Sequence, residues 1–212
     1  ITADGDEGLI VADADLADRI TSQAGLAGKG AEQIATGYHL TGEWFLDREL
    51  YPEAEALSAI LEAQGLQWFA YFSPFLTADT VTWDEAAAEG VILRTEDGED
   101  YLFDGPTFES MSMIDLSLPA GRAFAIERMQ AALDLGFSGW MADYAEWLPV
   151  DAAVHQGDPW LAHNAWPLLW QELNQAAIQG RDASFFVRSG WTGTGGLAPV
   201  VWLGDQETSF QP

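Results

Sequence analysis

The chain has 212 residues, of which 48% are hydrophobic, and its formal net charge is −26. A surface so rich in carboxylates argues against nucleic-acid binding, which needs Lys and Arg to replace the counterions of phosphates, and against contact with anionic membranes. The length and the apolar content predict one large domain with a sizeable core.

The basic residues are one lysine, Lys29, and seven arginines. A surface with almost no lysine and many carboxylates stays hydrated at high salt, where its self-repulsion is screened. We therefore expect a halophilic or salt-tolerant source, with an ordinary acidic protein as the alternative.

Cysteine and histidine are too scarce to suggest a metal centre. The absence of cysteine excludes disulfides and thiolate ligands. The three histidines, His39, His155 and His163, stand far apart, which argues against a histidine metal site. No apolar run approaches the roughly 20 residues of a membrane span. The sequence leaves the cellular compartment and the oligomeric state open.

Apolar spacing, together with prolines and glycines at the ends of periodic stretches, predicts the helices and strands. Residues 14–27 could form a short helix in a segment that is otherwise uninformative. Further along, the predicted elements are a helix between Pro52 and Gly65, a strand at 66–72, a surface excursion at 77–100 with a short helix at 84–89, a hairpin-like stretch at 101–103, a strand at 113–118, a helix at 119–135, a strand at 136–142, a helix at 160–179 that Pro167 interrupts, and strands at 183–188 and 200–203.

Strands that alternate with helices of roughly 10–20 residues imply parallel strands and an α/β architecture. Polar residues follow four of the strands, namely Ser73, Asp143, Arg188 and Asp205. In a parallel barrel these ends open on one face, where catalytic residues are collected. A doubly wound sheet would also bind ligands there, but the chain has no glycine-rich phosphate loop. We therefore predict a (β/α)₈ TIM barrel.

Asp143 and Asp205 each follow an apolar strand-like stretch. A carboxylate at the end of a buried strand is costly unless it is used or paired. Two such groups suit glycoside hydrolysis, in which one forms the glycosyl-enzyme and the other protonates the leaving oxygen and later activates water. The alternative is that each aspartate caps a helix or forms an ion pair.

Other side chains near these stretches have two open interpretations. Arg188 could bind substrate hydroxyls and keep a carboxylate ionised, or could pair with any of the many acids. His163 could be a ligand or a proton shuttle, although a packed, hydrogen-bonded histidine is the more frequent case. Tryptophans could present their faces to sugars or fill the core, and we least expect Trp191 to be buried. The tryptophans in this half of the chain are Trp140, Trp147, Trp166, Trp170, Trp191 and Trp202.

Four sequence blocks together resemble glycoside hydrolase family 31. They are Gly-Trp-Met-Ala-Asp-Tyr-Ala-Glu-Trp-Leu-Pro at 139–149, His-Asn-Ala-Trp-Pro-Leu-Leu-Trp at 163–170, Phe-Phe-Val-Arg-Ser-Gly at 185–190 and Trp-Leu-Gly-Asp-Gln at 202–206. Residues 46–52 and 71–75 resemble upstream strands of the family. The resemblance covers about residues 44–210 and is strongest to the bacterial α-glucosidase and sulfoquinovosidase-like branch.

The resemblance implies a retaining α-glycosidase that needs no cofactor and acts on an α-linked, glucose-like glycoside, with sulfoquinovose as one candidate sugar. Asp143 matches the nucleophile, Asp205 the general acid/base and Arg188 a substrate-binding arginine. Retention requires the two carboxyl groups to lie about 5–5.5 Å apart. The remaining residues that we expect at the substrate are Trp140, Trp202, Glu146 and His163, with Trp44 lining the sugar pocket.

The sequence departs from the family pattern in two places. Ala145 stands where the family usually has Gly, which matters if this position requires a positive φ. His39 and Gly42 stand where sulfoquinovosidases carry an Arg and a Trp that read the sulfonate.

We divide the chain into a divergent segment at 1–41 and a partial barrel at 42–212, which we expect to lack the last barrel strands and the flanking β-sandwich domains. The main alternative is an inactive barrel fragment that binds carbohydrate. A metal-dependent barrel hydrolase is a second alternative.

Overall fold

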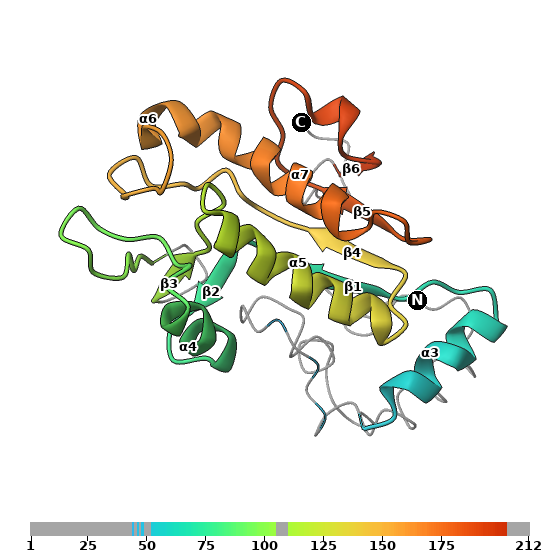
Figure 1. Cartoon of the computed structure of the whole chain (residues 1–212). Coiled ribbons are helices and arrows are strands. Elements are labelled where there is room, and N and C mark those ends of the chain that lie inside the picture. Colours follow the sequence, from blue (N-terminus) through green and yellow to red (C-terminus); the bar gives the residue numbers. More distant parts are fainter. Residues whose placement is uncertain (1–43, 45, 47, 49–51, 105–109, 203–212) are drawn as a thin grey trace, which may run out of the picture.

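The computed structural model describes residues 44, 46, 48, 52–104 and 110–202. Figure 1 shows the path of the chain, and the helix expected at 14–27 lies outside the described residues. In chain order the elements are α3 (Ala54–Ala63), β1 (Phe69–Phe72), β2 (Phe75–Thr77), α4 (Val81–Ala88), β3 (Met111–Met113), α5 (Pro119–Asp134), β4 (Gly139–Ala142), α6 (Pro159–Ala162), the 3₁₀ helix η1 (His163–Ala165), α7 (Trp166–Ala177), β5 (Ser184–Val187), the 3₁₀ helix η2 (Thr194–Gly196) and β6 (Val200–Val201).

Four strands form a parallel sheet in the order β1-β4-β5-β6, which is also their order along the chain. Helices lie in the crossovers, with α5 before β4 and α7 before β5. This is the repeating arrangement of a (β/α)₈ barrel, so the described part of the chain is a partial TIM barrel, as predicted. A separate antiparallel pair, β2 and β3, lies within the crossover from β1 to β4.

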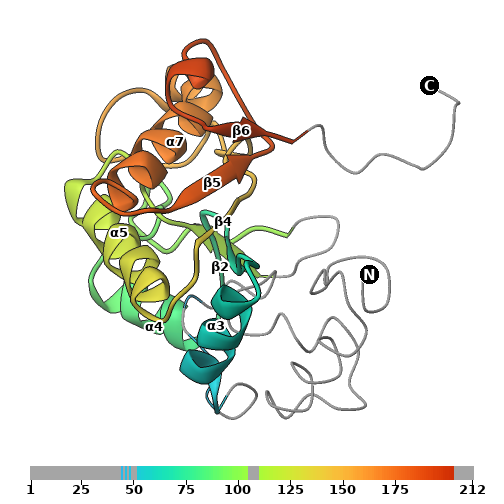
Figure 2. The ribbon, with the colours of Figure 1, turned by 90° about the vertical axis from the view of Figure 1, so that its right-hand side faces the viewer.

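Helices α5 and α7 lie side by side on one face of the parallel sheet, as Figure 2 shows from the edge. Successive strand residues point to opposite faces, and their burial alternates accordingly. The residues on the helix side are buried: Ala70, Phe72, Trp140, Ala142, Phe185 and Val187. Those on the other side are half-buried: Phe69, Tyr71, Met141, Ser184 and Phe186. Among the described residues, the helices therefore cover one face of the sheet fully, and Met141 of β4 is half-buried on the other face.

Gly139 allows the middle strand of this sheet to approach its neighbour closely. It is aligned with Phe69 on one side and with Ser184 on the other. A Cβ at this position would lie 1.7 Å from the carbonyl oxygen of Ser184, and its φ is +146°. Any larger residue would push β4 away from β5.

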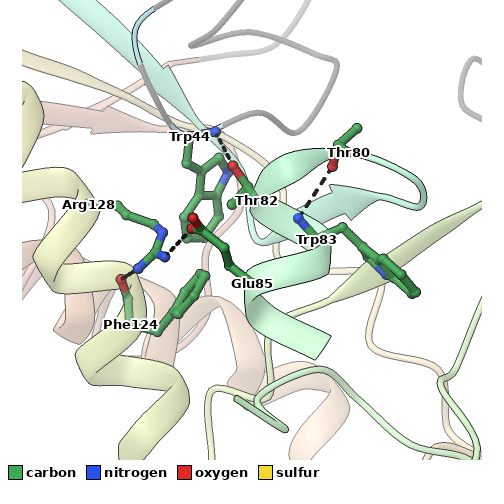
Figure 3. A network of polar contacts seen from close by, with 7 residues as sticks. All are labelled: Trp44, Thr80, Thr82, Trp83, Glu85, Phe124 and Arg128. Atoms are coloured by element: carbon green, nitrogen blue, oxygen red, sulfur yellow. Dashed lines mark hydrogen bonds and ion pairs between the residues drawn. The ribbon is translucent and has the colours of Figure 1, made fainter. Parts of the chain in front are cut away.

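Trp44 is part of the core on the helix side of the sheet. Its side chain is 3% exposed, and its ring centroid lies 5.6 Å from that of Phe72, 6.4 Å from that of Phe124 and 6.3 Å from that of Trp170. Its backbone N–H donates to Thr82 Oγ1 at 3.0 Å (Figure 3). Trp44 therefore joins β1, α4, α5 and α7, and the prediction that it lines a sugar pocket is wrong.

Polar contacts around Trp44 attach α4 to α5 (Figure 3). Arg128 Nη2 donates to Glu85 Oε2 at 2.6 Å, and the Arg128 guanidinium carbon lies 3.3 Å from the centre of the Phe124 ring. Thr80 Oγ1 caps α4 by accepting the backbone N–H of Trp83 at 3.3 Å. The Arg128–Glu85 contact holds α4 against α5, and the cap stabilises the start of α4.

The prolines and glycines marked several boundaries correctly. Pro119 begins α5, and Gly136 follows its end with a φ of +100°. Pro167 lies in the first turn of α7, where its missing N–H costs nothing, so it helps to begin a helix instead of interrupting one. Similarly, Gly65 follows the end of α3 with a φ of +72°.

Other boundaries differ from the prediction. The strand expected at 113–118 is β3, which ends at Met113 and pairs with β2 instead of joining the parallel sheet. The stretch at 77–100 is not a surface excursion throughout, because Val91, Ile92 and Leu93 are at most 2% exposed. No helix within the described ranges is long and apolar enough to cross a bilayer.

Candidate active site

A row of side chains follows the parallel strands at their carboxyl-terminal edge. The last aligned positions are Phe72, Ala142, Val187 and Val201. The residues that come next are Ser73, Asp143, Arg188 and Trp202. The catalytic residues of parallel barrels are collected at this edge. The register thus brings together three of the four strand-end residues noted in the sequence, and the fourth, Asp205, lies outside the described residues.

Asp143 is the acid of this row, and only 3% of the residue is exposed. The hydroxyl of Tyr71 donates to its Oδ2 at 2.6 Å, and Arg188 Nε lies 3.1 Å from its Oδ1. Its backbone N–H donates to the carbonyl oxygen of Phe72 at 2.8 Å, which continues the ladder between β1 and β4. One carboxylate oxygen thus accepts a hydrogen bond and the other lies in an ion pair, and both contacts favour the ionised form.

Tyr71 is a site residue that the sequence analysis missed. Burial, followed by the neighbouring charge of Asp143, raises the pKa of its hydroxyl far above the usual range. The hydroxyl therefore stays protonated and serves as a permanent donor. Tyr71 precedes Ser73 by two residues, so the alternation of a strand places both on one face. That alternation was the available signal.

Arg188 lies between two aromatic rings. Its guanidinium carbon is 3.9 Å from the centre of the Tyr144 ring and 5.5 Å from the centre of the Trp202 ring, within the range of cation–π attraction. Burial alone would lower the pKa of Arg188, but hydrogen bonding with Tyr144 and the charge of Asp143 raise it. Arg188 thus remains a fixed cation, and the acid with which it pairs is the predicted nucleophile.

Glu146 belongs to the same electrostatic neighbourhood. Burial raises the pKa of its carboxyl group, the charge of Arg188 opposes this shift, and the charge of Asp143 adds to it. Its Oε2 is buried and accepts no hydrogen bond from the described residues. The site therefore contains one acid held by two donors and a second acid that is poorly solvated.

The backbone after Asp143 turns through a left-handed conformation. Tyr144 has a φ of +55° and Ala145 a φ of +88°, a region that residues other than Gly rarely adopt. Ala145 is completely buried. The position where the family usually has Gly does require a positive φ, and the chain adopts it with alanine.

Comparison with known proteins identifies the family. Residues 23–212 match the glycosyl hydrolases family 31 TIM-barrel domain. The chain belongs to glycoside hydrolase family 31. This match begins at residue 23, whereas the resemblance recognised in the sequence begins at about residue 44.

Two curated family 31 relatives and one solved structure are similar over most of the chain. A sulfoquinovosidase of Agrobacterium fabrum is 35% identical over 188 residues, which are 85% of this chain and 28% of the relative. A sulfoquinovosidase of Escherichia coli is 32% identical over 187 residues, which are 85% of this chain and 27% of the relative. A family 31 sulfoquinovosidase from E. rectale, solved with an aza-sugar inhibitor, superposes with a TM-score of 0.77 at 29% identity, over 84% of this chain and 28% of that chain.

Trp140 does not join the row at the edge of the family 31 barrel. It is completely buried on the helix side, where its indole N–H donates to Asn174 Oδ1 of α7 at 2.6 Å. Trp140 precedes Asp143 by three residues, so the two side chains point to opposite faces of β4. The structure therefore corrects the expected substrate contact of Trp140, which is a core residue.

His163 is attached to the loop that follows β4. Its Nδ1 lies 2.6 Å from the carbonyl oxygen of Leu148, so it is a packed, hydrogen-bonded histidine. Its expected role at the substrate stays a prediction.

The other tryptophans divide between core and surface. Trp166 and Trp170 are completely buried, whereas Trp191 is 52% exposed, as expected. Trp147 packs against Tyr144 with ring centroids 5.3 Å apart. Among the described tryptophans, Trp202 lies beside Arg188, and Trp147 reaches the site through its contact with Tyr144.

The described residues contain no cluster of three or more His, Asp or Glu side chains that could hold a metal ion. The chemistry available at the edge is that of a buried carboxylate, a fixed cation, a phenol donor and aromatic faces. This set can present a nucleophile to an electron-poor carbon.

Proposed function

We propose that this chain provides the nucleophile, and with Asp205 the acid/base, of a retaining α-glycosidase. The observation that carries the proposal is the setting of Asp143: it is 3% exposed, follows the last aligned residue of β4, accepts a hydrogen bond from Tyr71 and forms an ion pair with Arg188. This setting keeps the carboxylate ionised and oriented.

In the proposed reaction, an Asp143 oxygen attacks the anomeric carbon while Asp205 protonates the departing oxygen. Water, deprotonated by Asp205, then hydrolyses the glycosyl-enzyme. Arg188 and Tyr71 stabilise the negative charge of Asp143 before the attack and when it leaves. Asp205 must hold a proton at working pH, for which a poorly solvated position beside Trp202 would suffice.

The proposed substrate is an α-linked, glucose-like glycoside, and a sulfoquinovoside is the first candidate. Two curated relatives and the structural neighbour are named as sulfoquinovosidases. The chain spans 28% and 27% of the length of those two relatives, so residues outside it would complete their pockets. Trp202, Glu146 and Arg188 are the candidates here for contact with sugar hydroxyls.

The main alternative is a barrel that binds carbohydrate without hydrolysing it. It is favoured by the fact that the Asp143 oxygens already face Tyr71 and Arg188, so Asp143 could serve as a purely structural ion-pair partner. The two proposals differ in whether a covalent intermediate forms.

The test is hydrolysis of nitrophenyl α-glucoside and nitrophenyl α-sulfoquinovoside at high salt. It uses this chain and a chimera in which residues 23–212 replace the matching segment of the A. fabrum sulfoquinovosidase. Turnover that Asp143→Asn abolishes and Asp205→Asn reduces supports the glycosidase. Sugar binding by a folded chimera without turnover supports the alternative instead.

A further inference from the structure

The turn after Asp143 is conformationally expensive and therefore needs support. Tyr144 and Ala145 are consecutive non-glycine residues with φ values of +55° and +88°. Side chains with a Cβ are strained in this conformation, so it persists only where the surroundings hold it. Ala145 is completely buried, so the turn is enclosed by other parts of the chain.

Ser189 supplies a contact that can hold this turn. Its Oγ donates a short hydrogen bond to the carbonyl oxygen of Tyr144. Ser189 follows Arg188 at the end of β5 and is 8% exposed, so water competes poorly for its hydroxyl. The bond therefore links the end of β5 to the left-handed turn at the end of β4.

Gln171 on α7 in turn fixes Ser189. Its Nε2 donates to the carbonyl oxygen of Ser189 at 2.8 Å, and Gln171 is completely buried. A rigid helix thus holds the backbone of Ser189, and Ser189 holds the backbone of Tyr144. The described contacts of Ser189 and Gln171 do not involve the carboxylate of Asp143.

The turn determines where two groups of the site lie. Tyr144 directly follows Asp143, and its ring lies 3.9 Å from the guanidinium carbon of Arg188. If Tyr144 itself left the left-handed region, the change in its φ would redirect its side chain, and the ring would leave Arg188. Without this ring contact, Arg188 would be less firmly held at its distance of 3.1 Å between Nε and Asp143 Oδ1.

We propose that Ser189 is a positioning residue, which holds the left-handed turn at 144–145 and thereby orients Asp143 and Arg188 for reaction. This inference rests on the proposed glycosidase function. It predicts an effect on kcat with little effect on KM, because the misplacement concerns the reacting group and not the affinity for the sugar.

The experiment compares three variants with the parent chimera. Ser189→Ala should lower kcat about 10–100-fold and change KM less than about threefold. Ser189→Thr, which keeps the hydroxyl, should retain most of the activity. Ser112→Ala is the matched control, since Ser112 is completely buried on β3 and its Oγ has no hydrogen-bond partner among the described residues. It should leave kcat unchanged.

The decisive variant is the double substitution Ser189→Ala/Ala145→Gly. Gly adopts a positive φ without strain, so it should restore most of the kcat that Ser189→Ala loses. If Ser189→Ala does not fold, the double variant alone decides the matter: a kcat near that of the parent supports the positioning role, and a lost kcat overturns it. An unchanged kcat in Ser189→Ala, or a loss that Ala145→Gly does not relieve, also overturns it.

A crystal structure of the Ser189→Ala variant of this chain gives a readout that does not depend on activity. The proposal expects the Tyr144 carbonyl to rotate and the Tyr144 ring to leave Arg188. An unchanged turn would overturn the inference. An inactive parent with a rearranged variant turn would instead refute the glycosidase function and leave the positioning of the turn supported.

Discussion

The two faces of β1, β4 and β5 are built from the same strands but have opposite properties. On the helix side, Phe72, Trp140 and Phe185 are completely buried, and the N–H of Trp140 is bonded to Asn174. On the other side, Asp143 contacts both Tyr71 and Arg188. One face is closed and apolar, whereas the other is partly open and carries charge. Stability and chemistry are thus separated by the alternation of side chains along the strands.

This contrast predicts different effects for substitutions on the two faces. Changes on the helix side should alter the free energy of unfolding and leave the kinetics of the folded protein unchanged. Changes on the open side should alter kinetics at least as strongly as stability.

The largest loss of stability is expected for Trp140→Ala. Removing a buried indole leaves a cavity and deprives Asn174 Oδ1 of its donor, so the free energy of unfolding should fall by about 3–5 kcal/mol. Urea unfolding measures the loss, and the kcat of the folded fraction should not change. A large drop in kcat with unaltered stability would mean that Trp140 acts at the substrate after all.

Arg188→Met should come next in stability and should abolish turnover. It leaves the buried Asp143 carboxylate without its cation, which we expect to cost about 2–3 kcal/mol, less than for a fully buried pair because Arg188 is 22% exposed. The matched control is the double variant Arg188→Met/Asp143→Asn, which removes the stranded charge. It should recover stability but not activity. Equal stability of the single and double variants would contradict a buried ion pair.

A smaller effect is expected for Tyr71→Phe. It removes one hydrogen bond to a charged acceptor, with an expected loss of about 1.5–2 kcal/mol. The kcat should fall because the Asp143 carboxylate loses one of its two described side-chain donors. Tyr101→Phe is a suitable control, since the Tyr101 hydroxyl donates to Asp151 at 2.6 Å in an exposed contact. If both variants had the same kcat, Tyr71 would have no part in orienting Asp143.

The smallest effect is a pH dependence at Glu146. Burial raises the pKa of its carboxyl group in the folded state, so the folded protein binds this proton more tightly than the unfolded chain does. The stabilisation is present at acidic pH and is lost as the pH rises through the raised pKa. Glu146→Gln should therefore increase the free energy of unfolding at pH 7 and have little effect near pH 4.

Urea titrations of Glu146→Gln and the parent across this pH range measure the difference. Glu172→Gln on α7 is a control for the change in net charge, because the Glu172 side chain is 44% exposed. A Glu146→Gln variant that is less stable than the parent at pH 7 would show that the Glu146 carboxylate is stabilised by a partner.

The helix boundaries set by proline and glycine were predictable from the sequence, because these residues act through their own backbone. Pro119 begins α5, Gly136 follows its end, and Pro167 lies in the first turn of α7. The proline ring fixes φ and the absence of a side chain frees the φ of glycine, and both effects are independent of the surroundings. The row formed by Asp143 and Arg188 was also predictable, since parallel strands end at one edge.

Side-chain surroundings were harder to predict, because they depend on residues far away in the sequence. The burial of Trp140 depends on Asn174, and the core position of Trp44 depends on Phe124 and Trp170. A tryptophan suits a sugar platform and a core equally well by composition. Counting alternate residues back from Asp143 would have assigned Trp140 to the helix side. The same count back from Ser73 on β1 would have placed Tyr71 on the side of Asp143.

The alternation in β4 also limits which genetic changes this segment can tolerate. An insertion or deletion of one residue between Gly139 and Asp143 would move the carboxylate into the helical layer and bring an apolar side chain to the open edge. Such a change would be more damaging than most single replacements, because every residue beyond it would exchange faces. Loop grafts and library designs for this protein should therefore preserve the length of β4 and vary the residues around it.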